Sequence, residues 1–154
     1  MTPDKAELEK WHKYFAIENN NIAWNLASKP MRTTAESAEM MHAAHASALH
    51  WGKIGTELNI MRATMLLAEV HALKGLFNSS LAYAEKVSVY FEQHKPYDWE
   101  LAFVHTIHAH AAAVAGRKDL HASQYHAAKR AIEAIADEED RKIVLQTFNQ
   151  VSVP

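Results

Sequence analysis

The sequence predicts an all-α protein, and three observations support that class. Its 154 residues include only four glycines and four prolines, too few for the frequent turns that strands need. Alanine, the strongest helix former, is abundant together with leucine, glutamate and lysine. Apolar residues such as Leu8, Trp11 and Phe15 recur at helical spacing. The length and the 49% hydrophobic content fit one globular domain, residues 1–154.

Start and stop signals place seven helices along this domain. Thr2 is expected to cap the first helix with Pro3 at its first position, and Lys29-Pro30 ends it because the residue before proline avoids helical geometry. The other expected starts are Thr33 or Thr34, Thr56, Asn78-Ser79-Ser80, Tyr97 or Asp98, Asp119 and Asp137. The other expected stops are Gly52-Lys53-Ile54-Gly55, Gly75, His94 before Lys95-Pro96, Gly116 and Ala136. Residues 151–154 are expected to fray.

The third and fifth expected helices resemble each other at a shift of 41 residues. Gly75 then falls on Gly116, and Ala68 on Ala109, so that small residues recur where two helices must approach closely. A helix–turn–helix unit that repeats after 20–50 residues is typical of a solenoid. The connections are short, which favours antiparallel hairpins. The expected architecture is an array of about three helical hairpins followed by a C-terminal capping helix.

Three segments, residues 41–75, 98–116 and 134–141, resemble a group of uncharacterised bacterial tetratricopeptide-repeat-like (TPR-like) proteins. The resemblance spans about residues 35–145 and leaves residues 1–34 outside. It is most specific in one block, which is Met41, His42, Ala43, Ala44, His45, Ala46 and Ser47. The resemblance implies a helical-repeat fold and no particular reaction. The repeat departs from the common pattern, because tetratricopeptide units are about 34 residues long.

Composition excludes several classes of function. Sixteen basic and eighteen acidic residues are interspersed, so neither nucleic acid nor a membrane surface is an expected partner. The absence of cysteine excludes disulfides, thiolate metal sites and a thiol nucleophile. The charged segment MTPDKAELEKW lacks the apolar core of a signal peptide, so we expect a cytoplasmic protein. The sequence contains no complete catalytic motif, and no cofactor is expected.

Eleven histidines are the unusual feature of the composition. His42 and His45 are three residues apart on one expected helix, and His105 and His108 on another, a spacing at which two imidazoles can share a metal ion. Glu39 and His42 match the Glu-x-x-His motif of di-iron bundles, but the remaining ligands of such a set cannot be identified. We therefore favour histidines that pack between helices, each with a hydrogen-bond partner, and keep a metal-binding protein or metal-dependent enzyme as the alternative.

In helical arrays the first helix of each hairpin lines a concave binding surface. The residues expected to face that groove are Arg62, Met65, Glu69, Phe103, Thr106 and His110. Arg62 and Glu69 lie two turns apart on one side of their helix and could bracket a polar backbone or a charged terminus. Trp11 is expected in the core, whereas Trp24 lies off its helix's main stripe and is either core or contact residue. The expected function is non-catalytic binding of a protein or peptide segment, or of a second copy of the chain.

Overall fold

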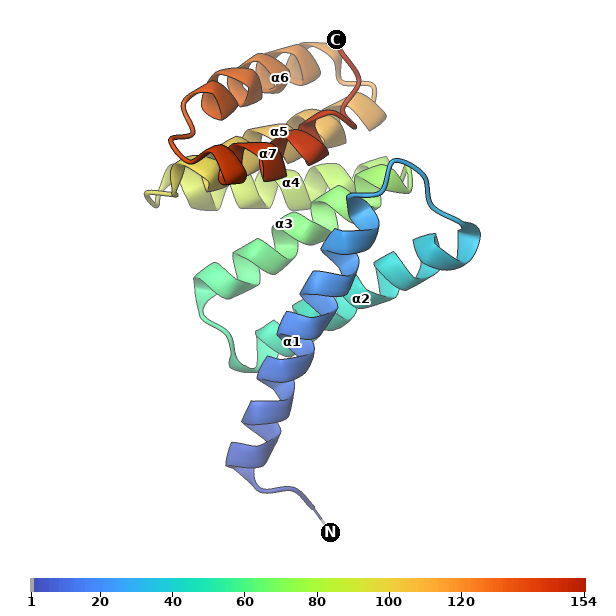
Figure 1. Cartoon of the computed structure of the whole chain (residues 1–154), viewed down its shortest axis with the longest axis vertical. Coiled ribbons are helices and arrows are strands. Elements are labelled where there is room, and N and C mark those ends of the chain that lie inside the picture. The colour runs from blue at the N-terminus through green and yellow to red at the C-terminus, as the bar shows by residue number, and fades with distance from the viewer. Residues whose placement is uncertain (1) are drawn as a thin grey trace.

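The computed structural model describes residues 2–154, and this part of the chain forms seven α-helices and no strand (Figure 1). The all-α class is therefore confirmed. The helices are α1 (Lys5–Ala27), α2 (Thr34–Ile54), α3 (Glu57–Leu73), α4 (Phe77–Glu92), α5 (Asp98–Val114), α6 (Lys118–Glu133) and α7 (Glu138–Phe148).

The helices pack most closely in consecutive pairs, α1 with α2, α3 with α4 and α5 with α6. Helices α1, α3, α5 and α7 also contact one another in that order and form a row. Each of α2, α4 and α6 packs between two successive members of this row. In Figure 1 the N terminus lies at one end of the molecule and α5, α6 and α7 gather at the other. None of the helices in residues 2–154 is long and apolar enough to cross a membrane.

Two of the expected helix caps are wrong. Asp4, not Thr2, caps α1, because the Asp4 carboxylate accepts a hydrogen bond from the Glu7 amide at 2.8 Å. Helix α4 begins at Phe77, so Ser79 and Ser80 lie in its first turn rather than before it. Sequence capping rules favoured these serines, but the Ser80 hydroxyl instead donates to the Ala68 carbonyl and ties α4 to α3.

Three other caps are confirmed by side-chain hydrogen bonds. The Thr33 hydroxyl accepts from the Glu36 amide, and the Asp137 carboxylate accepts from the Asp140 amide. Thr56 forms a reciprocal capping box with Asn59. Because these bonds satisfy backbone donors that a helix leaves free, they fix where α2, α3 and α7 begin.

The turns after α3 and α5 are built in the same way, 41 residues apart. Gly75 and Gly116 have φ of 71° and 69°, the left-handed conformation that glycine adopts without strain. The amide of Leu76 donates to the His71 carbonyl, and the amide of Arg117 donates to the Ala112 carbonyl. These bonds close Schellman turns, so the internal repeat seen in the sequence is confirmed in the backbone at this point.

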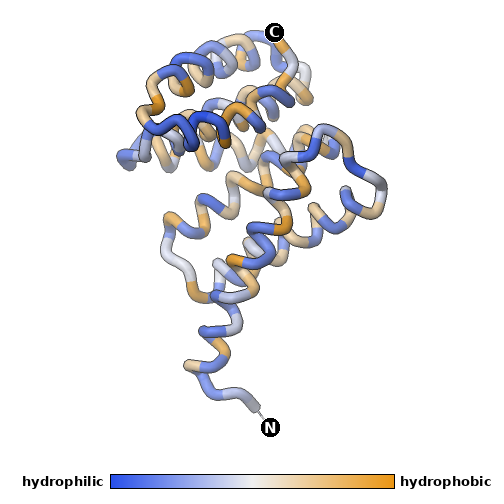
Figure 2. Tube along the Cα trace, in the orientation of Figure 1, coloured by the Kyte–Doolittle hydropathy of each residue, from blue (hydrophilic) through white to orange (hydrophobic). Residues whose placement is uncertain are grey.

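The core lies along the row of helices and uses alanine where helices approach closely. Ala68 and Ala109 are fully buried, as their repeat positions predicted. Figure 2 shows both hydrophobic and hydrophilic positions along the helices. Trp11 is not in the core, since 46% of it is exposed. Val151 is buried and the Ser152 carbonyl accepts from His121 at 2.7 Å, so the predicted fraying does not extend to this point.

Candidate functional site

A cavity of about 450 Å³ opens between α1, α3, α5 and α7 and is the candidate site; we call it the groove. Its size falls in the range of ligand-binding pockets. Every helix of the inner row contributes to it. The lining residues are Asn20, Trp24, Asn25 and Ser28 with Arg62, Met65, Trp99, Phe103, Ile143, Gln146 and Thr147.

Aromatic side chains form the apolar part of the groove. Trp24 of α1 contacts Phe103 of α5 with ring centroids 5.5 Å apart, and Trp99 meets Phe103 edge-on at 6.4 Å. Met65 of α3 lies beside them in the lining. Phe103 and Met65 are buried, whereas both tryptophans are partly exposed. The rings therefore present a preformed apolar surface that a ligand could cover, and Trp24 is a groove residue.

The charge of Arg62 is already compensated within the protein. Its Nε donates to Glu100 Oε2 at 2.6 Å, and Glu100 is only 2% exposed. The guanidinium also lies over the Trp99 ring, 5.6 Å from its centroid. Because an ion pair and a ring hold Arg62 in place, it can offer its remaining N–H groups but no uncompensated charge. The other lining residues carry no formal charge.

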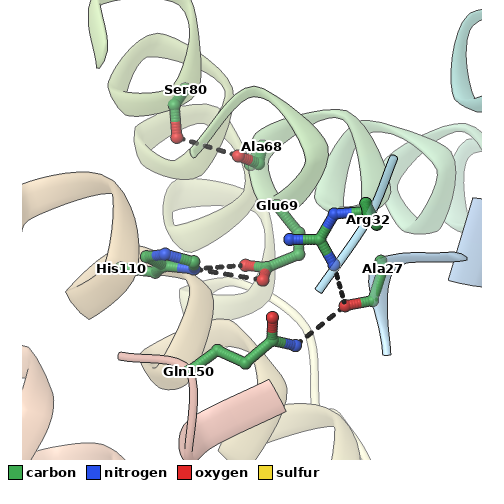
Figure 3. Close-up of polar contacts among 7 residues, drawn as sticks. All are labelled: Ala27, Arg32, Ala68, Glu69, Ser80, His110 and Gln150. Carbon is green, nitrogen blue, oxygen red and sulfur yellow. Dashed lines mark hydrogen bonds and ion pairs between the residues drawn. The ribbon is translucent and has the colours of Figure 1, made fainter. Parts of the chain in front are cut away.

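Three of the six residues expected in the groove do not line it. Glu69 and Thr106 are fully buried and His110 is nearly so. His110 Nδ1 lies 3.0 Å from both Glu69 carboxylate oxygens, which joins α3 to α5 (Figure 3). Glu69 therefore cannot bracket a ligand together with Arg62. Burial by itself lowers the pKa of His110, but the charge and hydrogen bond of Glu69 outweigh burial and raise it.

Two further side chains anchor the end of α1 beside this buried pair. Arg32 Nη1 donates to the carbonyls of Leu26, Ala27 and Lys29 at 3.2, 3.3 and 2.7 Å. Gln150 Nε2 donates to the Ala27 carbonyl at 2.8 Å, across 123 residues of chain (Figure 3). Carbonyls at the end of α1 are thus satisfied by one side chain that follows the helix closely, Arg32, and by one from a distant segment, Gln150.

The four histidines of the metal hypothesis do not come together. His45 pairs with His71, His105 Nδ1 lies 2.8 Å from the Gln124 amide oxygen, and His108 Nδ1 lies 2.8 Å from the Ser88 hydroxyl. His42 lines a separate shallow depression between α1 and α2. Within residues 2–154, no group of three or more His, Cys, Asp or Glu side chains is placed to hold a metal ion. The expectation that each helix-packed histidine has a hydrogen-bond partner fits His45 and His105, and it fits His108 only at Nδ1, because the buried Nε2 of His108 has no partner within residues 2–154.

Three of the packed histidines resist protonation. Burial lowers the pKa of His50 and of His71, and in each case a second imidazole, His12 or His45, lowers it further. Burial is also the largest influence on His108 and lowers its pKa, although nearby carboxylates oppose the shift. These imidazoles are structural groups held neutral by their surroundings.

Sequence reasoning missed the part of the groove that comes from α1 and α7. Asn20 and Asn25 belong to the segment that the family resemblance did not cover, and Ile143 and Gln146 to a helix that was expected only to cap the array. The structure marks Ile143 as a groove residue, because 54% of this β-branched apolar residue is exposed, but no sequence pattern indicated that exposure. Comparison of the chain with protein-family models, curated proteins and solved structures finds no match. The TPR-like resemblance stays a prediction.

Proposed function

We propose that this protein is a non-catalytic, TPR-like interaction module that binds an extended segment of another protein in the groove. The observation that supports this most directly is the origin of the groove: the first helices of three successive pairs, and α7 after them, line one cavity. Concave surfaces of this kind are where helical arrays bind partners. The repeated turns at Gly75 and Gly116 support the same architecture. We expect binding to occur in the cytoplasm, as the cysteine-free composition suggests.

The chemistry of the lining suggests what the segment contains. Trp24, Met65 and Phe103 offer an apolar surface, which fits an aromatic or aliphatic side chain. Asn20, Asn25 and Gln146 surround it with amides, which both donate and accept hydrogen bonds as an extended peptide backbone does.

The charge state of the groove further restricts the kind of segment that it would bind. Because Glu100 compensates Arg62, an acidic residue of the ligand would gain little from that guanidinium. We therefore expect an uncharged segment whose apolar side chain fills the cavity.

The test is a selection of displayed peptides on the full chain, followed by titration of an enriched, fluorescently labelled peptide. Ile143→Glu places a carboxylate in the lining and should weaken binding at least about tenfold. Val89→Glu is the matched control, because Val89 is a similarly exposed β-branched residue, 55% against 54%, on α4 outside the groove. It should leave the affinity unchanged. Failure to enrich any apolar peptide, or equal losses in both variants, would refute the proposal.

A further inference from the structure

The amino-terminal half of α1 carries an apolar patch that the rest of the chain leaves uncovered. Leu8, Trp11, Tyr14 and Phe15 are 42%, 46%, 52% and 42% exposed. We call these four residues the α1 patch. In Figures 1 and 2 this end of α1 extends beyond the other helices, and hydrophobic positions continue along it. None of the four lines the groove, so the patch is a separate feature.

The patch is ordered rather than a scatter of exposed residues. Leu8, Trp11 and Phe15 follow each other at steps of three and four, which places them on one side of the helix. Trp11 stacks on Phe15 with centroids 6.0 Å apart, and Tyr14 meets Phe15 edge-on at 5.3 Å. Phe15 is supported from α2 by His50, at 5.6 Å. Aromatic side chains held by their neighbours lose little freedom when a partner covers them.

The size of the patch matches an interface. An aromatic side chain offers about 150–250 Å², so half-exposure leaves about 100 Å² on each of the three rings, and Leu8 brings the patch to about 350 Å². Exposed patches of this size on monomers are often functional. Since about 60% of an interface is apolar, each partner would bury about 600 Å². Two copies would bury about 1,200 Å², the lower limit for a specific complex.

Charge and shape point to a second copy of the chain as the partner. This part of α1 carries both signs of charge, with acidic residues Asp4, Glu7, Glu9 and Glu18 and basic residues Lys5, Lys10 and Lys13. The near balance of signs does not oppose self-association, whereas a nucleic acid or anionic membrane would need a basic surface. The patch is a stripe on a protruding helix, and such a stripe is complementary to another helical stripe. We propose that two copies associate through their α1 patches about a two-fold axis.

The decisive measurement is the molar mass of the full chain by light scattering after size-exclusion chromatography, across micromolar concentrations. The mass should rise towards twice that of the monomer as concentration increases. Trp11→Glu should raise the dissociation constant at least about 100-fold, because a two-fold interface contains each substitution twice. Ala6→Glu is the control: Ala6 is exposed on the same helix and lies neither three nor four residues from any residue of the patch, so this variant should dimerise normally. Circular dichroism checks that both variants keep their helices.

Three outcomes would overturn the proposal. A wild-type mass that stays monomeric throughout would show that the patch has no self-affinity. Equal loss in Trp11→Glu and Ala6→Glu would show that charge on α1, rather than the patch, matters. Growth beyond a dimer that Ile143→Glu also abolishes would show that α1 of one copy enters the groove of another, a head-to-tail arrangement without a two-fold axis.

Discussion

The contact between α3 and α5 and the contact between α2 and α3 both use histidine, but the partner differs. Between α3 and α5, the His110 imidazole faces the buried Glu69 carboxylate, with Nδ1 3.0 Å from each oxygen. Between α2 and α3, His71 Nε2 faces His45 Nε2 at 3.0 Å, and His45 is exposed. The pKa of His110 is raised by its carboxylate, whereas burial and then His45 lower that of His71. The partner, not the residue type, decides the direction in which the pKa of the imidazole shifts.

The largest expected effect on stability comes from removing the Glu69 carboxylate. Glu69→Ala should destabilise the protein by about 3–5 kcal/mol, because it leaves the His110 imidazole buried without its partner. His45→Ala removes an exposed partner and should cost about 1 kcal/mol, the usual net contribution of one hydrogen bond. Urea unfolding of the three proteins at one pH measures both differences.

A double variant shows whether the destabilisation by Glu69→Ala depends on the contact between Glu69 and His110. Glu69→Ala combined with His110→Ala should cost clearly less than the sum of the two single substitutions, since the second change removes the group that the first left unpaired. Additive costs would mean that Glu69 and His110 act independently and that the contact between α3 and α5 rests on the surrounding apolar packing. The comparison with His45 would then lose its basis.

The fold could be predicted from local signals, because helices and their turns depend on residues close in sequence. Gly75 and Gly116, for example, mark left-handed turns whatever packs around them. The groove was predictable only in part. Arg62, Met65 and Phe103 line the groove, as expected from the 41-residue shift that relates α3 to α5. That shift also places Glu69 and His110 at equivalent positions, but periodicity does not tell how deep a residue lies.

Long-range pairings explain the remaining misses. Glu100 compensates Arg62 across 38 residues, and Gln150 reaches Ala27 across 123. No spacing rule connects such positions, because they meet only after several helices have packed. One consequence concerns Arg62: reversing its charge would place a second carboxylate beside the buried carboxylate of Glu100. Arg62→Glu should therefore weaken the fold as well as the groove.

The turns that end α3 and α5 are expected to show a smaller effect on stability, and they allow two equivalent backbone positions to be compared directly. Gly75→Ala and Gly116→Ala should each cost about 1–2 kcal/mol, and equal amounts, because both residues are left-handed and an added Cβ would meet nothing within 4 Å. Backbone strain is then the only contribution. Gly52→Ala is the control: Gly52 lies inside α2 with open space around it, so alanine should stabilise the protein by up to about 1 kcal/mol. Unequal costs at Gly75 and Gly116 in thermal unfolding would show that the two turns are not equivalent.

The pH dependence of stability tests the two histidine environments in opposite directions. His50, His71 and His108 have lowered pKa values in the folded protein, so below about pH 6.5 the unfolded chain takes up protons that the native state refuses. Stability from these residues falls as the pH drops. The pKa of His110 is raised, so its contribution is complete below about pH 6.5 and is lost as the pH rises through its folded value. Below about pH 6.5 the His110 contribution is already complete, so the three groups with lowered pKa values predict a net loss of stability on further acidification.

Single substitutions separate these opposing contributions in urea midpoints measured from about pH 8 to pH 5. His71→Gln should flatten the loss on acidification, because it removes a group that must charge on unfolding. His110→Gln should lower stability and steepen the loss, because it removes the one contribution that grows as protons are added. His126→Gln, at an exposed position on α6, should reproduce the wild-type dependence. If His71→Gln and His110→Gln instead changed the slope in the same direction, the two contacts would not differ in charge, and the contrast between carboxylate and imidazole partners would fail.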